Sequence, residues 1–481
     1  MLPTITVDVG TTSVKTCLFD ADARLLASAA APTPTRPDPW GEVYDPEALV
    51  GVVVAFVRGL DPALRATVQR VAITGVGESG GLVRPDATLA SPLVLWHDHR
   101  GADRLAGLGP AERTRVYQVT GLPVNANYGL SKIAWAVEHA GTGADGALWL
   151  NVAEWLAATM SGERWSERSL ASRTMALDLT TRAWSPEVCA LLGVDPAVLP
   201  PVADATHGAP VTAAFAARAG LPDGVAVHVA GHDHVVGGVG AGLRPGELLN
   251  STGTTEGLLV LADAPRLDAA AQRDKLANGL ACAGDASTLF ASIPTGGSAF
   301  ATLRSMLGLP AEDLSARIAV LHDRYVAGEL DLDAAPLVLP QFRGSPPPDK
   351  DAAARGIVAG LRTDATADDV VLGCFLGMAL QYRDVLDLFR VRPERVKVIG
   401  PASRNPLWLR LKADLLGTPL SVSGFPEVVS RGAQALASGT TGGWAANDPV
   451  DVAVDEARHA RLSRWADDVR PRWEHLRAYP W

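Results

Sequence analysis

The sequence predicts an α/β protein built from two related domains. Short apolar runs of strand length alternate with longer helical patterns, which is typical of α/β architecture. A strand–turn–strand unit near the N-terminus recurs after residue 242, with Gly-Thr-Thr in both turns, and this indicates an internal duplication. A length of 481 residues is enough for two or three domains with substantial cores.

The first half of the chain is expected to begin with strands. Its β-rich runs occupy residues 4–9, 14–19, 24–29, 71–76 and 225–230, and its helical patterns occupy residues 130–139 and 152–160. Asp45 followed by Pro46 is typical of a helix start, so a helix is predicted to about Leu60. The Pro-rich segment 32–40 is expected to be an exposed loop.

The second half repeats this opening. Its strands are predicted at residues 247–250, 257–261 and 396–399, and its strongest helices at 367–389 and 407–416. The first of these helices is apolar on nearly all sides, so we expect it to be buried. Residues 345–348 are expected to form an exposed loop. The repeat gives an N-terminal domain of residues 1–242 and a C-terminal domain of residues 243–481.

Composition argues against several classes of protein. A net charge of -10 and a pI near 5.5 argue against a nucleic-acid surface, which would need a basic face. No apolar run is long enough to span a bilayer, and the N-terminus lacks the features of a secretory signal. Four scattered cysteines are expected to be buried thiols: Cys17, Cys189, Cys282 and Cys374. We therefore expect a cytoplasmic protein with no nucleic-acid or membrane partner.

A turn rich in glycine and hydroxyl groups follows the first strand and contains Gly10, Thr11, Thr12 and Ser13. Glycine lets the backbone approach a phosphate closely, and amides and hydroxyls donate hydrogen bonds to its oxygens. Asp8, at the end of the strand, can hold a magnesium ion through water. The Walker pattern is absent. An ordinary hairpin turn explains this segment equally well.

A second turn of the same kind contains Gly253, Thr254 and Thr255. If it faces the first turn across a cleft, the two can grip the β- and γ-phosphates of a nucleotide. A plain hairpin is again the alternative, and the repetition of Gly-Thr-Thr favours phosphate binding.

Asp233 follows a buried strand, where the ligand sites of open α/β sheets concentrate. A carboxylate there can accept a proton from a sugar hydroxyl that attacks the γ-phosphorus. The alternative is that Asp233 caps the helix that follows, and the two roles are compatible.

Two further segments are candidate binding sites. Trp96 can pack against the carbon face of a sugar and Asp98 can bind its hydroxyls, whereas Arg100 alone is better explained by a structural ion pair. The turn after the strand at 396–399 can bring backbone against an adenine or ribose. Its candidate residues are Gly400, Pro401 and Asn405.

The histidines permit a different function. Two His-Asp-His clusters, at residues 97–99 and 232–234, place pairs of imidazoles two residues apart. In extended chain each pair points to one side, and four histidines can bind a metal, as in a metallohydrolase. Neither pair has a zinc-ligand spacing, and both lie where the chain is turning, so this function is the less favoured one.

Several motifs resemble those of the FGGY family of sugar kinases. The family's Asp-x-Gly-Thr-x-Ser-x-Lys/Arg is matched at residues 8–15, its Trp-x-Asp-x-Arg at 96–100, and its Gly-x-Asp before a Gly/Ala-rich segment at 231–233. The C-terminal pattern is similar at Gly400, Ser403, Asn405, Pro406, Leu407, Lys412, Ala413, Asp414, Glu427, Gly432 and Ala433. The motifs follow one another in the right order and run through nearly the whole chain.

The resemblance implies two ribonuclease-H-like (actin-like ATPase) domains with the active site in the cleft between them. It further implies that the N-terminal domain holds the sugar and the C-terminal domain most of the nucleotide. ATP and Mg²⁺ would be the cofactors and Asp233 the general base. Closure of the two domains would exclude water, which competes with the sugar for the phosphoryl group.

The chain departs from common family patterns at two places. Pro401 stands where a second glycine is usual, so a backbone amide near the nucleotide is lost. A Gly-Glu-Ser-Gly segment occupies the place of Gln-Met-His in xylulose kinases and Gln-Arg-Glu in glycerol kinases. The chain is therefore assigned to neither enzyme. Glu78, Ser79 and Asn127 are candidates for sugar specificity, and Gly80 is expected to leave room for a longer or branched substrate.

We therefore predict an ATP-dependent kinase of a ketose or alditol with four to six carbons. The alternatives are a metal-dependent hydrolase that uses both His-Asp-His clusters and an actin-like sugar sensor without catalytic activity. Asp8, Asp233 and both Gly-Thr-Thr turns argue against a silent sensor. The expected partner is a small sugar or polyol, and a homodimer is one assembly that the sequence leaves open.

Overall fold

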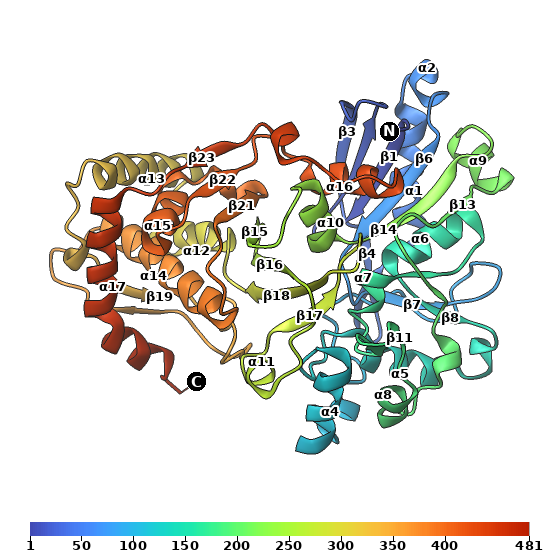
Figure 1. The fold of residues 1–481 in the computed structure, drawn as a ribbon, viewed down its shortest axis with the longest axis horizontal. Helices are drawn as coiled ribbons and strands as arrows, with labels where there is room; N and C mark the ends of the chain where they lie inside the picture. Colours follow the sequence, from blue (N-terminus) through green and yellow to red (C-terminus); the bar gives the residue numbers. More distant parts are fainter. Residues whose placement is uncertain (481) are drawn as a thin grey trace.

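Two mixed β-sheets, one in each lobe of the molecule, organise the chain (Figure 1). The computed structural model describes residues 1–480. The first sheet has the strand order β13, β14, β6, β1, β2, β3, with bounds Gly208–Pro210, Ala226–His232, Arg70–Gly75, Thr4–Val9, Ser13–Phe19 and Leu25–Pro32. The second sheet has the order β17, β18, β16, β15, β21, β22, β23, with bounds Ala277–Leu280, Ser287–Ile293, Glu256–Ala262, Glu247–Thr252, Arg395–Ile399, Leu420–Val422 and Val450–Val452.

The two sheets share one topology over six strands. β1 pairs antiparallel with β2 and parallel with β6, and β15 pairs in the same way with β16 and β21. The outer strands β3, β14 and β13 correspond to β18, β22 and β23, again with the same directions of pairing. This shared order supports the duplication inferred from the repeated turns. The predicted boundary after Gly242 lies between β14 and β15 and stays a prediction, and Trp481 lies outside the described residues.

Helices cover both sheets. Those of the first lobe are α1 Pro46–Gly59, α2 Pro62–Arg65, α3 Ala102–Ala106, α4 Pro110–Thr120, α5 Gly129–Ala140, α6 Val152–Ser161, α7 Arg168–Ala171, α8 Pro186–Leu191 and α9 Ala213–Ala219. Those of the second lobe are α11 Ala269–Arg273, α12 Ser298–Leu307, α13 Ala311–Val326, α14 Ala367–Leu388, α15 Pro406–Leu416 and α17 Glu456–Arg477. α6 packs on β6 and β14, and α14 packs on α15 and β18. As predicted, α14 is buried along most of its length.

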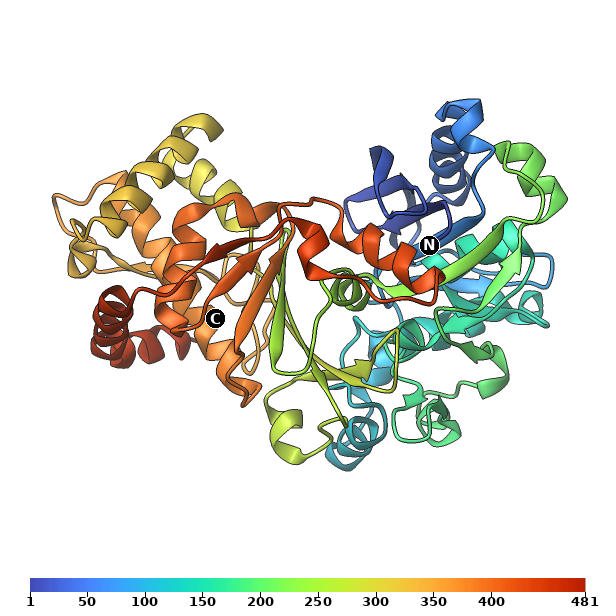
Figure 2. The ribbon, with the colours of Figure 1, turned by 45° about the horizontal axis from the view of Figure 1, so that its top comes forward.

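Two helices lie where the lobes meet: α10 (Asp233–Gly240) and α16 (Val428–Ala437). α16 comes from the second half of the sequence, but it packs on β1, β6 and β14 of the first sheet (Figure 2). Glycines let α10 and α16 approach closely, because a Cβ on Gly240 would lie 2.0 Å from the Val428 carbonyl oxygen. The two halves of the chain are therefore joined by a tightly packed helix pair.

Five short two-stranded pairs complete the fold. They are β4 Thr35–Asp38 with β5 Gly41–Tyr44, β7 Gly80–Val83 with β8 Leu148–Asn151, β9 Ser166–Glu167 with β12 Val202–Ala203, β10 Leu177–Asp178 with β11 Ala183–Trp184, and β19 Leu337–Leu339 with β20 Ile357–Ala359. The predicted cap of α1 is confirmed, since the Asp45 side chain accepts a hydrogen bond from the Ala48 amide at 3.1 Å. All four cysteines are buried and free.

Two segments predicted as exposed loops differ in part from that expectation. Part of the segment 32–40 is strand β4, and the Asp38 carboxylate at its end is bound by Arg100 at 3.0 Å. The start of the segment 345–348 is buried, because the Ser345 hydroxyl donates to the Asp349 carbonyl and accepts from the Asp351 amide, which closes the turn on itself. Within residues 1–480, none of the helices is both long and apolar enough to cross a membrane.

Candidate active site

A cavity of about 350 Å³ lies at the carboxyl ends of the central strands, where the two lobes meet. The ends of β1 and β14 contribute Asp8 and Asp233, and the turn after β1 contributes Thr11 and Thr12. From the second lobe come residues 251–255 and the turn after β21, with Gly400 and Pro401. The shared topology of the two sheets brings these turns together across one cavity.

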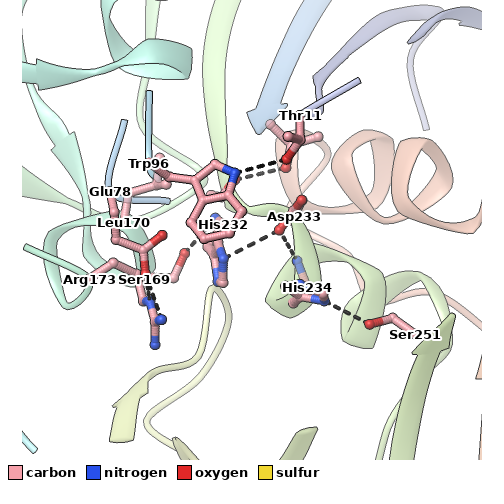
Figure 3. Close-up of polar contacts among 12 residues, drawn as sticks. Thr11, Glu78, Trp96, Ser169, Leu170, Arg173, His232, Asp233, His234 and Ser251 are labelled. Carbon is pink, nitrogen blue, oxygen red and sulfur yellow. Dashed lines mark hydrogen bonds and ion pairs between the residues drawn. The ribbon is translucent and has the colours of Figure 1, made fainter. Parts of the chain in front are cut away.

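The carboxylate of Asp233 is held on one side only. Its Oδ1 accepts a hydrogen bond from the His234 amide at 2.6 Å and lies 3.3 Å from the Nε2 of His232 (Figure 3). None of residues 1–480 donates a hydrogen bond to its Oδ2. Burial and the charge of Glu78 raise the pKa of Asp233 to about 7, although the His234 amide and the charge of Arg173 lower it. The carboxylate is therefore oriented and weakly basic.

Two histidines beside Asp233 are neutral. Burial and the charge of Arg173 lower the pKa of His232 well below its usual value and lower that of His234 to about 4. The Nε2 of His232 lies beside the Asp233 carboxylate, 3.3 Å from its Oδ1. The Nδ1 of His234 lies 2.7 Å from the Ser251 hydroxyl, at the end of β15. These contacts connect the carboxylate to both sheets.

Asp8 lies at the end of β1, and its Oδ1 is buried without a hydrogen-bond partner among the described residues. Burial, and then the negative charge of Asp233, raise the pKa of Asp8 to about 7, while the charge of Lys15 lowers it. Lys15 forms an ion pair of 3.1 Å with Glu427, which joins the two halves of the chain. An orphaned carboxylate oxygen close to a second carboxylate fits a divalent cation that also binds phosphates.

The first turn is a tight hairpin corner. The Gly10 amide donates to the Ser13 carbonyl at 3.1 Å, and Ser13 itself already belongs to β2. Thr11 and Thr12 line the cavity, whereas Gly10 and Ser13 are not among the lining residues. The Thr11 hydroxyl accepts a hydrogen bond of 3.0 Å from the indole nitrogen of Trp96, which also lines the cavity. This indole fixes the turn at its exposed corner.

The second turn rests on its neighbours within its own lobe. The Gly253 amide donates to the Thr255 carbonyl at 2.9 Å, and the Gly253 carbonyl accepts from the Gly297 amide at 2.9 Å. Gly253 and Thr254 also border a second, larger cavity of about 650 Å³. Its walls are mostly apolar and include Phe300, Ile318, Phe375, Pro401, Asn405 and Trp408. The Asn405 side chain caps α15 by accepting from the Trp408 amide at 3.0 Å.

On the other side of Asp233, Glu78 and Arg173 form a buried ion pair with a shortest distance of 2.6 Å. Glu78 has a φ of +64°, a conformation that costs energy for a non-glycine residue and is frequent at functional sites. The Arg173 guanidinium lies over the rings of Tyr128 and Phe290, at 5.1 and 5.7 Å from their centroids. Since Phe290 belongs to β18, this arginine reaches the second lobe.

The other predicted sugar contacts already have protein partners. Both oxygens of Asp98 accept hydrogen bonds from Arg100, so the expected structural ion pair of Arg100 is confirmed. The Asn127 side-chain oxygen lies 2.8 Å from the Nε2 of His99. The hydroxyl of Ser79 is buried and lies 3.4 Å from that of Tyr44.

The expectation for Gly80 was wrong. A Cβ at Gly80 would lie 2.3 Å from the Leu150 carbonyl oxygen, because Gly80 pairs with Asn151 between β7 and β8. The missing side chain therefore makes room for a neighbouring strand, not for a substrate.

The histidine clusters do not form a metal site. Across residues 1–480, no three His, Cys, Asp or Glu side chains are grouped closely enough to hold an ion. His99 and His234 are bound instead to Asn127 and Ser251. The hypothesis of a metal-dependent hydrolase depended on a metal site formed by both His-Asp-His clusters, and the structure does not support such a site.

Comparison with known proteins gives the family. The model of the N-terminal domain of the FGGY family of carbohydrate kinases matches residues 4–240, and that of the C-terminal domain matches residues 248–440. The chain belongs to the FGGY family of carbohydrate kinases. It is therefore a phosphotransferase, with ATP and Mg²⁺ as its cofactors.

Relatives extend over the whole length of this FGGY kinase. Glycerol kinases of Aromatoleum aromaticum and Nocardia farcinica are each 28% identical to it, over 96% and 99% of the chain and 97% and 98% of those enzymes. A ligand-bound xylulose kinase of Lactobacillus acidophilus has a TM-score of 0.86 at 17% identity and covers 99% of both chains. The Plasmodium falciparum glycerol kinase with ADP has a TM-score of 0.82 at 17% identity and covers 98% of both. The structural likeness shows the fold of two actin-like ATPase domains.

Two residues around Asp233 were missed from the sequence, and a third was proposed only as a metal ligand. The missed residues, Arg173 and Ser169, contact Glu78 and the His232 amide. His232, proposed only for a metal, lies beside the Asp233 carboxylate. A signal was available, because residues 166–174 contain three serines, a threonine, two arginines and a glutamate. Such a run in a buried part of the chain indicates a polar network.

Proposed function

We propose that this FGGY kinase transfers the γ-phosphoryl group of ATP to a hydroxyl of a ketose or alditol with four to six carbons, with Asp233 as the general base. The asymmetry of the Asp233 carboxylate supports this role. Its Oδ1 is held by His232 and His234, while its Oδ2 has no donor among the described residues and the side chain lines the cavity.

In the proposed step, the acceptor hydroxyl gives its proton to the Oδ2 of Asp233. Its oxygen forms a bond to the γ-phosphorus as the bond from that phosphorus to the bridging oxygen breaks and ADP leaves. A pKa near 7 suits a general base, because the group is available at neutral pH and still binds a proton strongly. Asp8 would hold the Mg²⁺, which supplies positive charge for the phosphate oxygens.

The two turns would bind phosphates and the larger cavity the nucleoside. Thr11, Thr12, Thr254 and Thr255 present hydroxyl groups and amides to the smaller cavity, and glycine at position 253 lets the backbone come close. The apolar walls beside Pro401, Gly400 and Asn405 suit an adenine ring. The loss of an amide at Pro401 would be tolerated where the contact with the base is apolar.

The acceptor would lie between Trp96 and the Glu78–Arg173 pair. The Trp96 ring can cover its carbon face, and the carboxylate and guanidinium can accept and donate hydrogen bonds to its hydroxyls. We expect no direct contact between the acceptor and three further predicted residues, because each of them is bound to a protein group: Ser79, Asp98 and Asn127. They would support the residues that touch the acceptor. Specificity would then depend most on Glu78 and Arg173.

Glycerol is a second candidate substrate. The curated relatives with 28% identity over nearly the whole chain are named glycerol kinases. A three-carbon polyol would occupy the space beside Asp233 and leave the Glu78–Arg173 pair with fewer partners.

A panel of ketoses and alditols with three to six carbons, assayed for ADP release with ATP and Mg²⁺, tests the proposal. We expect kcat/KM to be highest for one acceptor of four to six carbons. Reactions without acceptor measure ATP hydrolysis, and Asp233→Asn measures transfer without the base. A preference for glycerol would show that the acceptor is a three-carbon polyol and contradict the proposed range of four to six carbons. Turnover of Asp233→Asn near the wild-type rate would show that Asp233 is not the general base.

A further inference from the structure

The peptide group between Gly231 and His232 lies in an irregular part of the first sheet. The register of β14 on β6 shifts between Val229 and Gly231, and Gly231 has a φ of +123°, which favours glycine. Irregularities of this kind re-aim the side chains that follow them and are frequent beside active sites. Asp233 is the second residue after Gly231.

Two hydroxyl groups hold both polar atoms of this peptide group. The Thr74 hydroxyl, on β6, donates to the Gly231 carbonyl oxygen at 2.8 Å. The Ser169 hydroxyl, on α7, accepts from the His232 amide at 2.9 Å (Figure 3). Thr74 and Ser169 are 0% and 1% exposed, so solvent does not compete for these bonds. The peptide plane is fixed from two different elements.

The direction of the Ser169 hydroxyl is also fixed. It donates its proton to the Oε2 of Glu167, and the same oxygen accepts from the amides of Ser169 at 2.8 Å and Leu170 at 3.2 Å. With its only proton used in this way, the hydroxyl oxygen is left to accept from the His232 amide. Space for a side chain is also missing, because a Cβ on Gly231 would lie 2.5 Å from the Ser169 hydroxyl oxygen.

We infer that Thr74 and Ser169 are positioning residues whose hydroxyls clamp the Gly231–His232 peptide group and thereby aim the Asp233 carboxylate. The inference rests on the proposed role of Asp233 as general base. Rotation of this peptide would move the His232 ring, which contacts Oδ1, together with the start of α10, which carries Asp233. Reacting groups tolerate little misplacement, since about 1 Å can cost about a hundredfold in rate.

Thr74→Val and Ser169→Ala each remove one hydroxyl with little change in volume. We expect each to lower kcat about 10- to 100-fold, with KM for ATP and for the acceptor changed less than about 2-fold. Thr74→Ser keeps the hydroxyl and should retain kcat within about 2-fold. In Ser169→Ala, amide hydrogen exchange at His232 should also become faster, because its acceptor is lost.

Matched controls exist in the same lobe. Thr4 is a buried threonine of the adjacent strand whose hydroxyl also donates to a backbone carbonyl at 2.8 Å, at the far end of the sheet. Ser185 is a buried serine whose hydroxyl accepts an amide hydrogen bond from Val188, remote from Asp233. Thr4→Val and Ser185→Ala therefore carry the same chemical changes, and their kcat should stay within about 2-fold of wild type.

Combination with Asp233→Asn separates the clamp from the base. If the clamp acts through Asp233, then Thr74→Val and Ser169→Ala should lower residual turnover no further in the Asp233→Asn protein. A full additional loss in that background would overturn the clamp, as would single variants that behave like their controls. Turnover of Asp233→Asn near the wild-type rate would instead overturn the base assignment, which the single variants do not test.

Discussion

The turn after β1 and the turn after β15 occupy equivalent places in two sheets of the same topology, but they differ in charge. Two residues before the turn glycine, the first has Asp8 and the second has Ser251. Asp8 is a buried carboxylate with an unpartnered oxygen, whereas the Ser251 hydroxyl is bound to His234. The two hairpins share one backbone arrangement, and a carboxylate in the first stands where a hydroxyl stands in the second.

The difference has a physical reason. A nucleoside triphosphate carries several negative charges, and a metal ion that bridges its phosphates neutralises part of them. A carboxylate at both turns would repel the phosphates. The second hairpin has one buried acid, Glu256. It adds no unpaired negative charge, because it forms an ion pair with the buried ammonium group of Lys412. The Gly-Thr-Thr motif alone therefore does not say what a turn does.

The largest effect is expected for Asp233→Asn, on the charged side. The amide keeps the size of the side chain and can still accept from the His234 amide but cannot take a proton, so kcat should fall roughly a hundredfold or more. Nucleotide affinity, measured by calorimetry, should stay nearly unchanged. Thr254→Ala, on the neutral side, should raise the KM for ATP while keeping most of kcat. Equal losses of kcat in both variants would contradict separate roles for the two sides, catalysis on the first and nucleotide binding on the second.

Asp8→Asn and Ser251→Ala compare equivalent positions directly. Loss of the Asp8 carboxylate should lower activity about 10- to 100-fold at limiting Mg²⁺, the range for groups that hold a metal through its outer sphere. Loss of the Ser251 hydroxyl removes one neutral hydrogen bond, worth about 0.5–1.5 kcal/mol. Titration of activity with Mg²⁺ measures both variants. If the Mg²⁺ midpoint shifts as much in Ser251→Ala as in Asp8→Asn, the two positions play the same part in binding Mg²⁺.

Trp96→Phe should have a smaller effect. Phenylalanine keeps an aromatic ring but cannot donate to Thr11, and among residues 1–480 no indole donates to the second turn. The loss of one net hydrogen bond of about 0.5–1.5 kcal/mol should change kcat/KM by about 2- to 10-fold. Steady-state kinetics with each substrate varied in turn measures it. No change in either constant would mean that the indole does not fix the first turn.

The smallest effect concerns stability. The pKa of Asp8 and that of Asp233 are both raised from 3.8 to about 7, so the folded protein binds protons more tightly than the unfolded chain between these values. The free energy of unfolding should therefore fall as pH rises from about 4 to about 7. Asp8→Asn should flatten this slope, and Ser251→Ala should leave it unchanged, in urea titrations without Mg²⁺ at pH 5 and pH 8. An unaltered slope in Asp8→Asn would contradict the raised pKa.

The sequence predicted the fold and the cavity-lining turns well, because these depend on local signals. Strand-length runs that end in Gly-Thr-Thr gave β1, β2, β15 and β16 nearly at their observed bounds. Helix α17 was missed although its buried positions have helical spacing, at Leu462, Trp465, Ala466, Val469 and Trp473, because its other faces are strongly polar.

The surroundings of Asp233 were not predictable in the same way. Thr74 and Ser169 lie 157 and 63 residues from the two ends of the peptide group that they bind, and Glu78 lies 95 residues from Arg173. Their roles therefore depend on which elements pack side by side. Gly80 shows the opposite failure, since a segment chosen for its motif position turned out to be sterically fixed by β8. Local pattern identifies which residues form an element, but contacts between distant elements decide what each side chain faces.

The position of α16 has a consequence for synthesis of the chain. The helix covers β1, β6 and β14, yet it is encoded at residues 428–437, nearly 200 residues after the last strand that it covers. At a ribosomal rate of about 5–20 residues per second, the first sheet waits about 10–40 s for this cover. During that interval one apolar face of a nearly complete sheet is open to other chains and to chaperones. The first lobe is therefore synthesised first, but it cannot complete its folding until α16 has been synthesised.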